Sequence, residues 1–141
     1  MSYLHFQRFN PRRRAVVELQ IGDKVTAHYK TGKYAGEITD VRPAHYLVRV
    51  LAVLKHPKQG DLHNPNEAEG VFFHERRALA HREQANITKQ MVKPFADDMP
   101  DYDESLRAAI AKMKEELAND SSKWTELSLR NLESLEKDYF K

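Results

Sequence analysis

The chain has 141 residues, no cysteine, and a composition that is 40% hydrophobic and 31% charged, as expected for one soluble globular domain. The lack of cysteine excludes disulfides, thiolate metal sites, a cysteine nucleophile and a lipid attached through cysteine. No apolar run approaches the roughly 18 residues of a membrane-spanning helix, and residues 1–14 lack the continuous apolar segment of a secretory signal.

The formal net charge of +2 is unevenly distributed. Residues 1–94 contain 16 Lys and Arg against 9 Asp and Glu, whereas residues 95–141 contain 7 against 12. This asymmetry fits nucleic-acid binding, but it also fits packing of an acidic part on a basic part. We favour the second interpretation, because only Arg12–Arg14 form a tight basic cluster.

Residues 1–15 are interpreted as a leader, and the β pattern begins beyond it. From Lys24 to Lys30 apolar and polar residues alternate, which predicts a strand with one buried face. Gly32 is expected to supply the positive φ of a tight turn, and residues 34–41 the return strand, with a bulge at Gly36. Residues 46–54, YLVRVLAVL, predict a central strand buried on both faces.

Residues 55–70 form a long polar segment without periodicity, which is typical of a functional or disordered loop. Further short strands are predicted at residues 71–74 and 77–82, and a last strand at residues 91–95. Asn86–Ile87 is predicted to be the single-turn connector before that last strand. The sequence therefore predicts a five-stranded β-barrel over residues 16–95.

Residues 96–141 predict a helical hairpin packed on the barrel. Asp101 and Glu104 fit a helix-starting capping pair, and apolar residues then recur at helical spacing up to Leu117. Residues 119–122 separate this helix from a second one that carries Trp124. The apolar stripes are expected to cover the barrel, and docking onto a partner helix or a second copy is the alternative.

Three kinds of chemistry are conceivable for this sequence. Five of the histidines, His45, His56, His63, His74 and His81, fall in one window, but no two are three to five residues apart, so no metal site is expected. No catalytic triad order, phosphate-binding glycine loop or apolar carboxylate pair is recognisable, so we expect neither an enzyme nor a cofactor. Nucleic-acid binding remains an alternative, carried by Tyr34, Tyr46, Phe72 and Phe73 with Arg49, Arg76, Arg77 and Arg82.

Several long stretches resemble the kinase-associated protein B family of spore-forming bacteria. They are YKTGKYAGEITDVRPAHYLVRVLAVLKHPKQGDLHNP (29–65), FFHERRALAHREQANI (72–87), QMVKPF (90–95) and LEKDYF (135–140). The resemblance implies an SH3-like barrel followed by C-terminal helices. It also implies an accessory protein of a membrane sensor histidine kinase that feeds the phosphorelay starting sporulation. Members are often labelled lipoproteins, and this sequence departs from that label because it has no cysteine.

These observations lead to one functional hypothesis. The protein is a non-enzymatic accessory protein that binds a sensor histidine kinase, and an SH3-like nucleic-acid-binding module is the alternative. It is expected to be cytoplasmic, to reach the membrane only through its kinase partner, and to be able to form a homodimer. In SH3-type barrels partners dock between the long loops, which gives these partner-binding candidates: Tyr34, His45, Tyr46, His56, Asp61, His63, Phe73 and Arg76.

Overall fold

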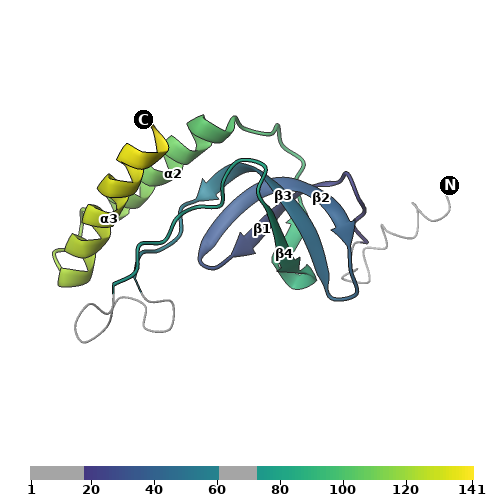
Figure 1. Cartoon of the computed structure of the whole chain (residues 1–141), viewed down its shortest axis with the longest axis horizontal. Coiled ribbons are helices and arrows are strands. Elements are labelled where there is room, and N and C mark those ends of the chain that lie inside the picture. Colours follow the sequence, from purple (N-terminus) through teal and green to yellow (C-terminus); the bar gives the residue numbers. More distant parts are fainter. Residues whose placement is uncertain (1–17, 61–72) are drawn as a thin grey trace.

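The computed structural model describes residues 18–60 and 73–141, which form an antiparallel sheet with a helical hairpin at one end (Figure 1). The elements in chain order are β1 (Lys24–Tyr29), β2 (Gly32–Val41), β3 (His45–Lys55), β4 (Gln84–Thr88), η1 (Lys89–Met91), β5 (Val92–Pro94), α2 (Tyr102–Leu117) and α3 (Lys123–Tyr139). The five strands lie in the order β4-β3-β2-β1-β5, and every neighbouring pair is antiparallel.

The predicted class, five strands followed by two helices, is confirmed. The described ladders leave β4 and β5 as the two edges, so closure of the sheet into a barrel is not shown. The strand at residues 46–54 corresponds to β3, but the central strand of the sheet is β2.

The segment before β5 was predicted wrongly. Of the strands predicted at residues 71–74 and 77–82, the described residues 73–82 contain none, and residues 71–72 lie outside the described residues. Residues 84–88, which include the predicted connector, form β4. In β4 the buried Ala85 and Ile87 alternate with exposed polar residues, but five residues are too few to make that period distinctive. The single helical turn follows β4, at Lys89–Met91.

The β1–β2 connection is a two-residue turn, because Tyr29 pairs with Gly32. The positive φ angles belong to Lys30 (45°) and Thr31 (68°), not to Gly32 as predicted. Gly32 is needed for another reason: a Cβ there would lie 2.6 Å from the Tyr34 hydroxyl oxygen. The tyrosine ring therefore occupies the space that a side chain would need.

Gly36 lies at the predicted irregularity in β2. The β2–β3 register shifts between Ala35 and Gly36, and a Cβ on Gly36 would lie 2.1 Å from the Arg49 carbonyl oxygen. Only glycine allows the two backbones to approach this closely.

The residues that the structure describes form three apolar clusters. The sheet has its own core, formed by Leu19, Val25, Ala27, Ile38, Tyr46, Val48, Ala85, Ile87 and Val92. A second core joins the sheet to the hairpin, formed by Tyr34, Val50, Val53, Ala78, Leu106, Ala109 and Ile110. A third lies inside the hairpin beyond the sheet, formed by Met113, Leu117 and Leu132 with Trp124 and Leu129 against them.

Both helices begin at side-chain caps. The Asp101 carboxylate accepts a hydrogen bond from the Glu104 backbone N–H at 3.1 Å, as the sequence predicted. The Ser122 hydroxyl accepts one from the Thr125 N–H at 3.2 Å. Among the described helices, none combines the length and the apolar character required to cross a bilayer.

Candidate functional site

Two extended segments leave the sheet together and run along the hairpin (Figure 1). We call these segments, residues 55–60 and 73–80, the arm. Gly60 N–H donates to the His74 carbonyl at 2.9 Å. The Gln59 side chain bridges the two segments as a backbone amide would, because its Nε2 donates to the Arg76 carbonyl and its Oε1 accepts from the Arg76 N–H, both at 2.9 Å.

The arm is tied to α3 by side chains of the helix. Trp124 Nε1–H donates to the Gln59 carbonyl at 3.3 Å, and Asn131 Nδ2 donates to the His74 carbonyl at 3.3 Å. The described part of the predicted loop is therefore anchored between the sheet and the hairpin.

His56 is the most enclosed polar residue of the arm, with no exposed surface. Its Nδ1 lies 3.0 Å from the Pro57 carbonyl, which can only accept, so Nδ1 carries the proton. The other nitrogen, Nε2, then accepts from the Tyr139 hydroxyl at 3.0 Å, and that hydroxyl accepts from the Ala78 N–H at 2.9 Å. Burial lowers the His56 pKa, against a smaller opposing effect of the Pro57 carbonyl, so the network is built for a neutral ring.

Ionic contacts reinforce this end of α3. The Arg77 guanidinium bonds the Asp138 carboxylate at 2.6 Å and lies over the Tyr139 ring, 5.0 Å from its centroid. We call the group His56, Arg77, Ala78, Asp138 and Tyr139 the C-terminal latch. The latch explains why the segment LEKDYF matters to the fold: it fastens the last turn of α3 to the arm.

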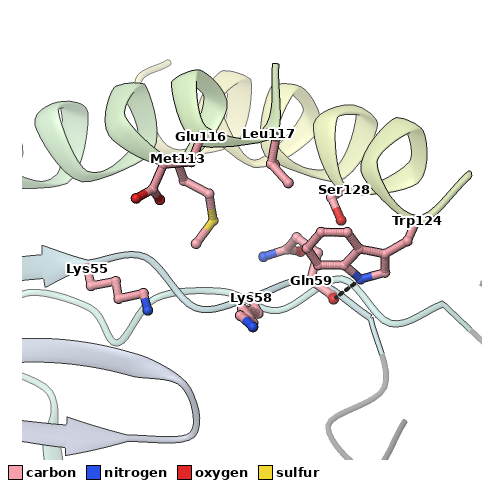
Figure 2. A pocket seen from close by; sticks show the side chains of 8 residues that line it. All are labelled: Lys55, Lys58, Gln59, Met113, Glu116, Leu117, Trp124 and Ser128. Carbon is pink, nitrogen blue, oxygen red and sulfur yellow. Dashed lines mark hydrogen bonds between the residues drawn. The ribbon is translucent and has the colours of Figure 1, made fainter. Parts of the chain in front are cut away.

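A cavity of about 260 Å³ lies between the hairpin and the arm (Figure 2). We call it the hairpin cavity; its lining residues are Lys55, Lys58, Gln59, Met113, Glu116, Leu117, Trp124 and Ser128. Figure 2 shows Ser128 directed from α3 toward this space, beside the Trp124 ring. Ser128 is 1% exposed, and its Oγ has no hydrogen-bond partner among the described residues.

A second hollow of about 260 Å³ continues the hairpin cavity along α2. The two share Lys55, Met113 and Glu116, and the second hollow adds Lys33 and Lys112. None of the four lining lysines (Lys33, Lys55, Lys58, Lys112) forms an ion pair with a residue in 18–60 or 73–141. The arrangement is an apolar floor with a rim of four lysines, which outnumber the one carboxylate, Glu116, that lines the same hollows.

A third cleft, of about 320 Å³, lies on the arm at Pro57 and Leu79. It contains two of the predicted candidates, Tyr34 and Arg76. Tyr34 is nevertheless 1% exposed, its hydroxyl accepts from the Leu79 N–H at 3.2 Å, and burial raises its pKa to about 12. Arg76 Nε donates to the Gly60 carbonyl at 2.9 Å. Both side chains therefore already hold the arm together.

The predicted partner-binding residues do not form one surface. His45 and Tyr46 begin β3 and His56 follows its end, so the two groups lie at opposite ends of this strand of 11 residues, which would span up to about 33 Å if it were straight. Tyr46 and His56 are buried, as is Tyr34, which makes them parts of the interior. Phe73 is half-buried, next to Gly60, and Asp61 and His63 lie outside the described residues.

The same geometry bears on the metal and nucleic-acid hypotheses. In residues 18–60 and 73–141 no group of three or more His, Asp or Glu side chains could hold a metal ion. Of the residues proposed to contact nucleic acid, Tyr34 and Tyr46 are buried and Arg49 is paired with Glu37 at 3.2 Å. The two tyrosine rings are therefore not available to stack on bases, and the charge of the partly exposed Arg49 is already balanced by a carboxylate.

Sequence reasoning missed the hairpin cavity. The apolar residues of the hairpin were assigned to covering the sheet, which is correct for Leu106 and Ile110. The stripe continues to Leu117, however, past the part of α2 that contacts the sheet core. The sequence signal for the cavity was that the apolar stripe of α2 is longer than the part of the helix that packs on the sheet.

The sequence model of a family described as "Kinase associated protein B" matches residues 29–140. The chain belongs to this family. Kinase-associated lipoprotein B of Bacillus subtilis (strain 168) is 57% identical over 121 residues, which are 86% of this chain and 94% of that protein. The X-ray crystal structure of kinase-associated protein B from Bacillus cereus is similar with a TM-score of 0.74 at 47% identity, covering 86% of this chain and 98% of the other. The family resemblance seen in the sequence is therefore confirmed.

The family match covers β2 to β5 and both helices, and it ends at Phe140, directly after the latch residues Asp138 and Tyr139. The matched region thus contains the arm, the hairpin and every strand of the sheet except β1, of which it includes only Tyr29.

Proposed function

We propose that this protein is a non-enzymatic accessory protein that binds a sensor histidine kinase and supports the phosphorelay leading to sporulation. The observation that carries the proposal is membership of a family described as kinase-associated, with a match over residues 29–140. Because the match includes the arm and the hairpin, the proposed kinase-binding unit is the sheet and hairpin together.

The chemistry of the hollows supports recognition of a protein. The hairpin cavity combines an aromatic ring, a thioether and lysine side chains, which are common constituents of protein-binding surfaces. Its walls are fixed by the Trp124–Gln59 hydrogen bond, so little ordering free energy would be lost on binding.

We further propose that the sheet curls into an SH3-like barrel. The strand β1 contacts β4 although the two are not neighbours in the sheet, as expected where an open sheet bends toward closure. We place the protein in the cytoplasm, where the kinase partner would bring it to the membrane.

Direct binding to the kinase tests the proposal. The purified full chain is titrated into the cytoplasmic part of a sensor histidine kinase from the same organism, with heat of binding as the readout. Autophosphorylation and phosphotransfer are then followed with and without the accessory protein. We expect saturable one-to-one binding and faster phosphotransfer; absence of binding to every sensor kinase of the organism contradicts the proposal.

A further inference from the structure

We propose that the hairpin cavity and the hollow beside it bind an acidic segment of the kinase partner, with one apolar side chain of that segment inserted beside Trp124. This inference rests on the proposed function and deepens it, because it names the surface and the chemistry of the partner.

The size of the cavity selects the kind of occupant. Pockets for drug-sized ligands and cofactors usually measure about 300–1,000 Å³. A cavity of about 260 Å³ with an apolar floor of Met113, Leu117 and Trp124 suits one or two side chains of a peptide. The shared wall with the second hollow extends the surface along α2, as a peptide main chain would require.

The Ser128 hydroxyl indicates that the occupant carries a polar atom as well. A buried hydroxyl without a hydrogen bond is unfavourable in the folded protein, and such groups are uncommon in native structures. Ser128 lines the cavity and its Oγ has no partner among the described side chains and backbone. A peptide amide or carboxylate beside the inserted side chain would supply the missing hydrogen bond.

The charges around the two hollows indicate that the partner segment is negatively charged. Four lysines surround the two hollows, against one acidic lining residue, Glu116. Lys24 and Lys114 are, by contrast, neutralised by carboxylates, Lys24 by Glu37 at 2.8 Å and Lys114 by Glu136. Unpaired cations around a preformed cavity attract an acidic segment and raise its rate of association.

Trp124 provides a direct probe, because it is the only tryptophan in the chain. The full chain is produced with 5-fluorotryptophan, and the unlabelled cytoplasmic part of the kinase is titrated while the ¹⁹F resonance of Trp124 is recorded. We expect the resonance to shift over the same concentrations at which heat of binding saturates. Kinase binding that leaves the resonance unchanged overturns the cavity as the docking site, while the proposed function stands.

Two variants and a matched control test the chemistry. Ser128→Ala is expected to weaken kinase binding about fivefold, as for one lost hydrogen bond. The double variant Lys58→Glu/Lys112→Glu is expected to weaken it at least tenfold at low salt and less at high salt. Lys93→Glu/Lys137→Glu changes the net charge equally at exposed positions away from both hollows and is expected to bind as the wild type. Equal affinities for all four proteins overturn the proposal.

If the wild type binds no kinase, the proposed function fails and a second measurement decides the cavity. Tryptophan-free, Asp- and Glu-rich peptides, each with one Leu, Phe or Met, are titrated against the fluorine-labelled chain. A shift that Ser128→Ala and Lys58→Glu/Lys112→Glu weaken supports an acidic protein segment from another partner. No shift with any peptide, a shift only with an oligonucleotide, or concentration-dependent self-association through Trp124 overturns the inference.

Discussion

The Tyr139 hydroxyl joins three segments of the chain at one point. It donates to His56 Nε2 at 3.0 Å and accepts from the Ala78 N–H at 2.9 Å, so it links α3 to both sides of the arm. The Arg77 guanidinium covers the ring from the solvent side. Loss of this one oxygen leaves two polar groups without partners.

We therefore expect Tyr139→Phe to lower the free energy of unfolding by about 2 kcal/mol, the typical cost of buried polar groups left unpaired. Urea denaturation followed by circular dichroism measures the change. Tyr29→Phe is the matched control, because the Tyr29 hydroxyl makes no hydrogen bond with another described residue. Equal stability of the two variants would show that the hydrogen bonds of the Tyr139 hydroxyl contribute nothing to stability.

The lowered pKa of His56 predicts a dependence of stability on pH. An unfolded histidine binds a proton near pH 6.5. The folded His56 binds it only at lower pH, because burial and the acceptor role of Nε2 oppose the charged ring. The free energy of unfolding should therefore be constant above about pH 7 and fall as the pH drops below 6.5 toward the folded pKa.

Urea unfolding at pH values between 5 and 8 checks this expectation. The lowered carboxylate pKa values of Glu37, Asp120 and Asp138 affect stability mainly below about pH 5, at the lower edge of this window. His56→Gln should remove most of the slope between pH 5 and 7, whereas the exposed His28→Gln should keep it. A slope that survives His56→Gln assigns the pH dependence to another group.

In the protein without its partner, the unpartnered Ser128 hydroxyl is expected to lower the free energy of unfolding. Replacing its unpartnered hydroxyl removes a buried polar group that has no described partner. Ser128→Ala should raise the free energy of unfolding by about 1 kcal/mol. A thermal melt of the isolated chain measures this. A destabilised Ser128→Ala would mean that the hydroxyl is satisfied in solution.

At the scale of elements, local signals predicted the helices and most strands. The Asp101 cap and the helical spacing of Leu106, Ile110 and Leu117 depend on residues a few positions apart, so they are readable in the sequence. The strand β4 was not found, because five residues carry too little periodicity. The expectation of an SH3-like barrel rested on the family resemblance and not on residue patterns.

The site was harder to predict because it depends on distant contacts. Residues 55–60 have no periodicity, which favoured a functional loop, yet His56 is buried by Tyr139, 83 positions away in the chain. Gln59 is likewise buried, and its side chain is hydrogen-bonded to the backbone of Arg76, 17 positions away in the chain. Substitution of His56 is therefore expected to destabilise the fold, although the sequence analysis named it as a partner-binding candidate.

Two glycines of the sheet region, Gly22 before β1 and Gly36 within β2, differ in what they require. Gly22 has a φ of 93°, but a Cβ there would have no atom within 4 Å, so Gly22→Ala should cost about 1 kcal/mol for backbone strain alone. Gly36→Ala would place a Cβ against the Arg49 carbonyl and force β2 from β3, costing at least about 3 kcal/mol. Urea denaturation ranks the variants, and a larger loss for Gly22→Ala would contradict the β2–β3 contact.

At the scale of the whole molecule, the three apolar clusters divide the structure into a sheet and an attached hairpin. The sheet core contains no residue of α2 or α3, whereas the other two cores depend on the hairpin. The latch is the connection between the arm and the end of α3. The local stability of the hairpin and the arm should therefore depend on the C-terminal residues more than the local stability of the sheet does.

Removing residues 136–141 tests this division, because it deletes Asp138, Tyr139 and Phe140 together. Phe140 lies under the Arg107 guanidinium, 3.7 Å from the ring centroid, so the deletion also frees the middle of α2 from α3. We expect amide hydrogen exchange to accelerate at least tenfold in α3 and in the arm, including at Ala78 N–H, while β1, β2 and the paired part of β3 keep most of their protection. The milder variant Arg77→Gln removes the ion pair with Asp138 and the cation–π contact with the Tyr139 ring but keeps the Tyr139 hydroxyl and its hydrogen bonds. It should give a smaller change, confined to the arm and the last turn of α3. Uniform loss of protection across sheet and hairpin would instead show one cooperative unit, in which the latch supports the sheet core as strongly as it holds the hairpin.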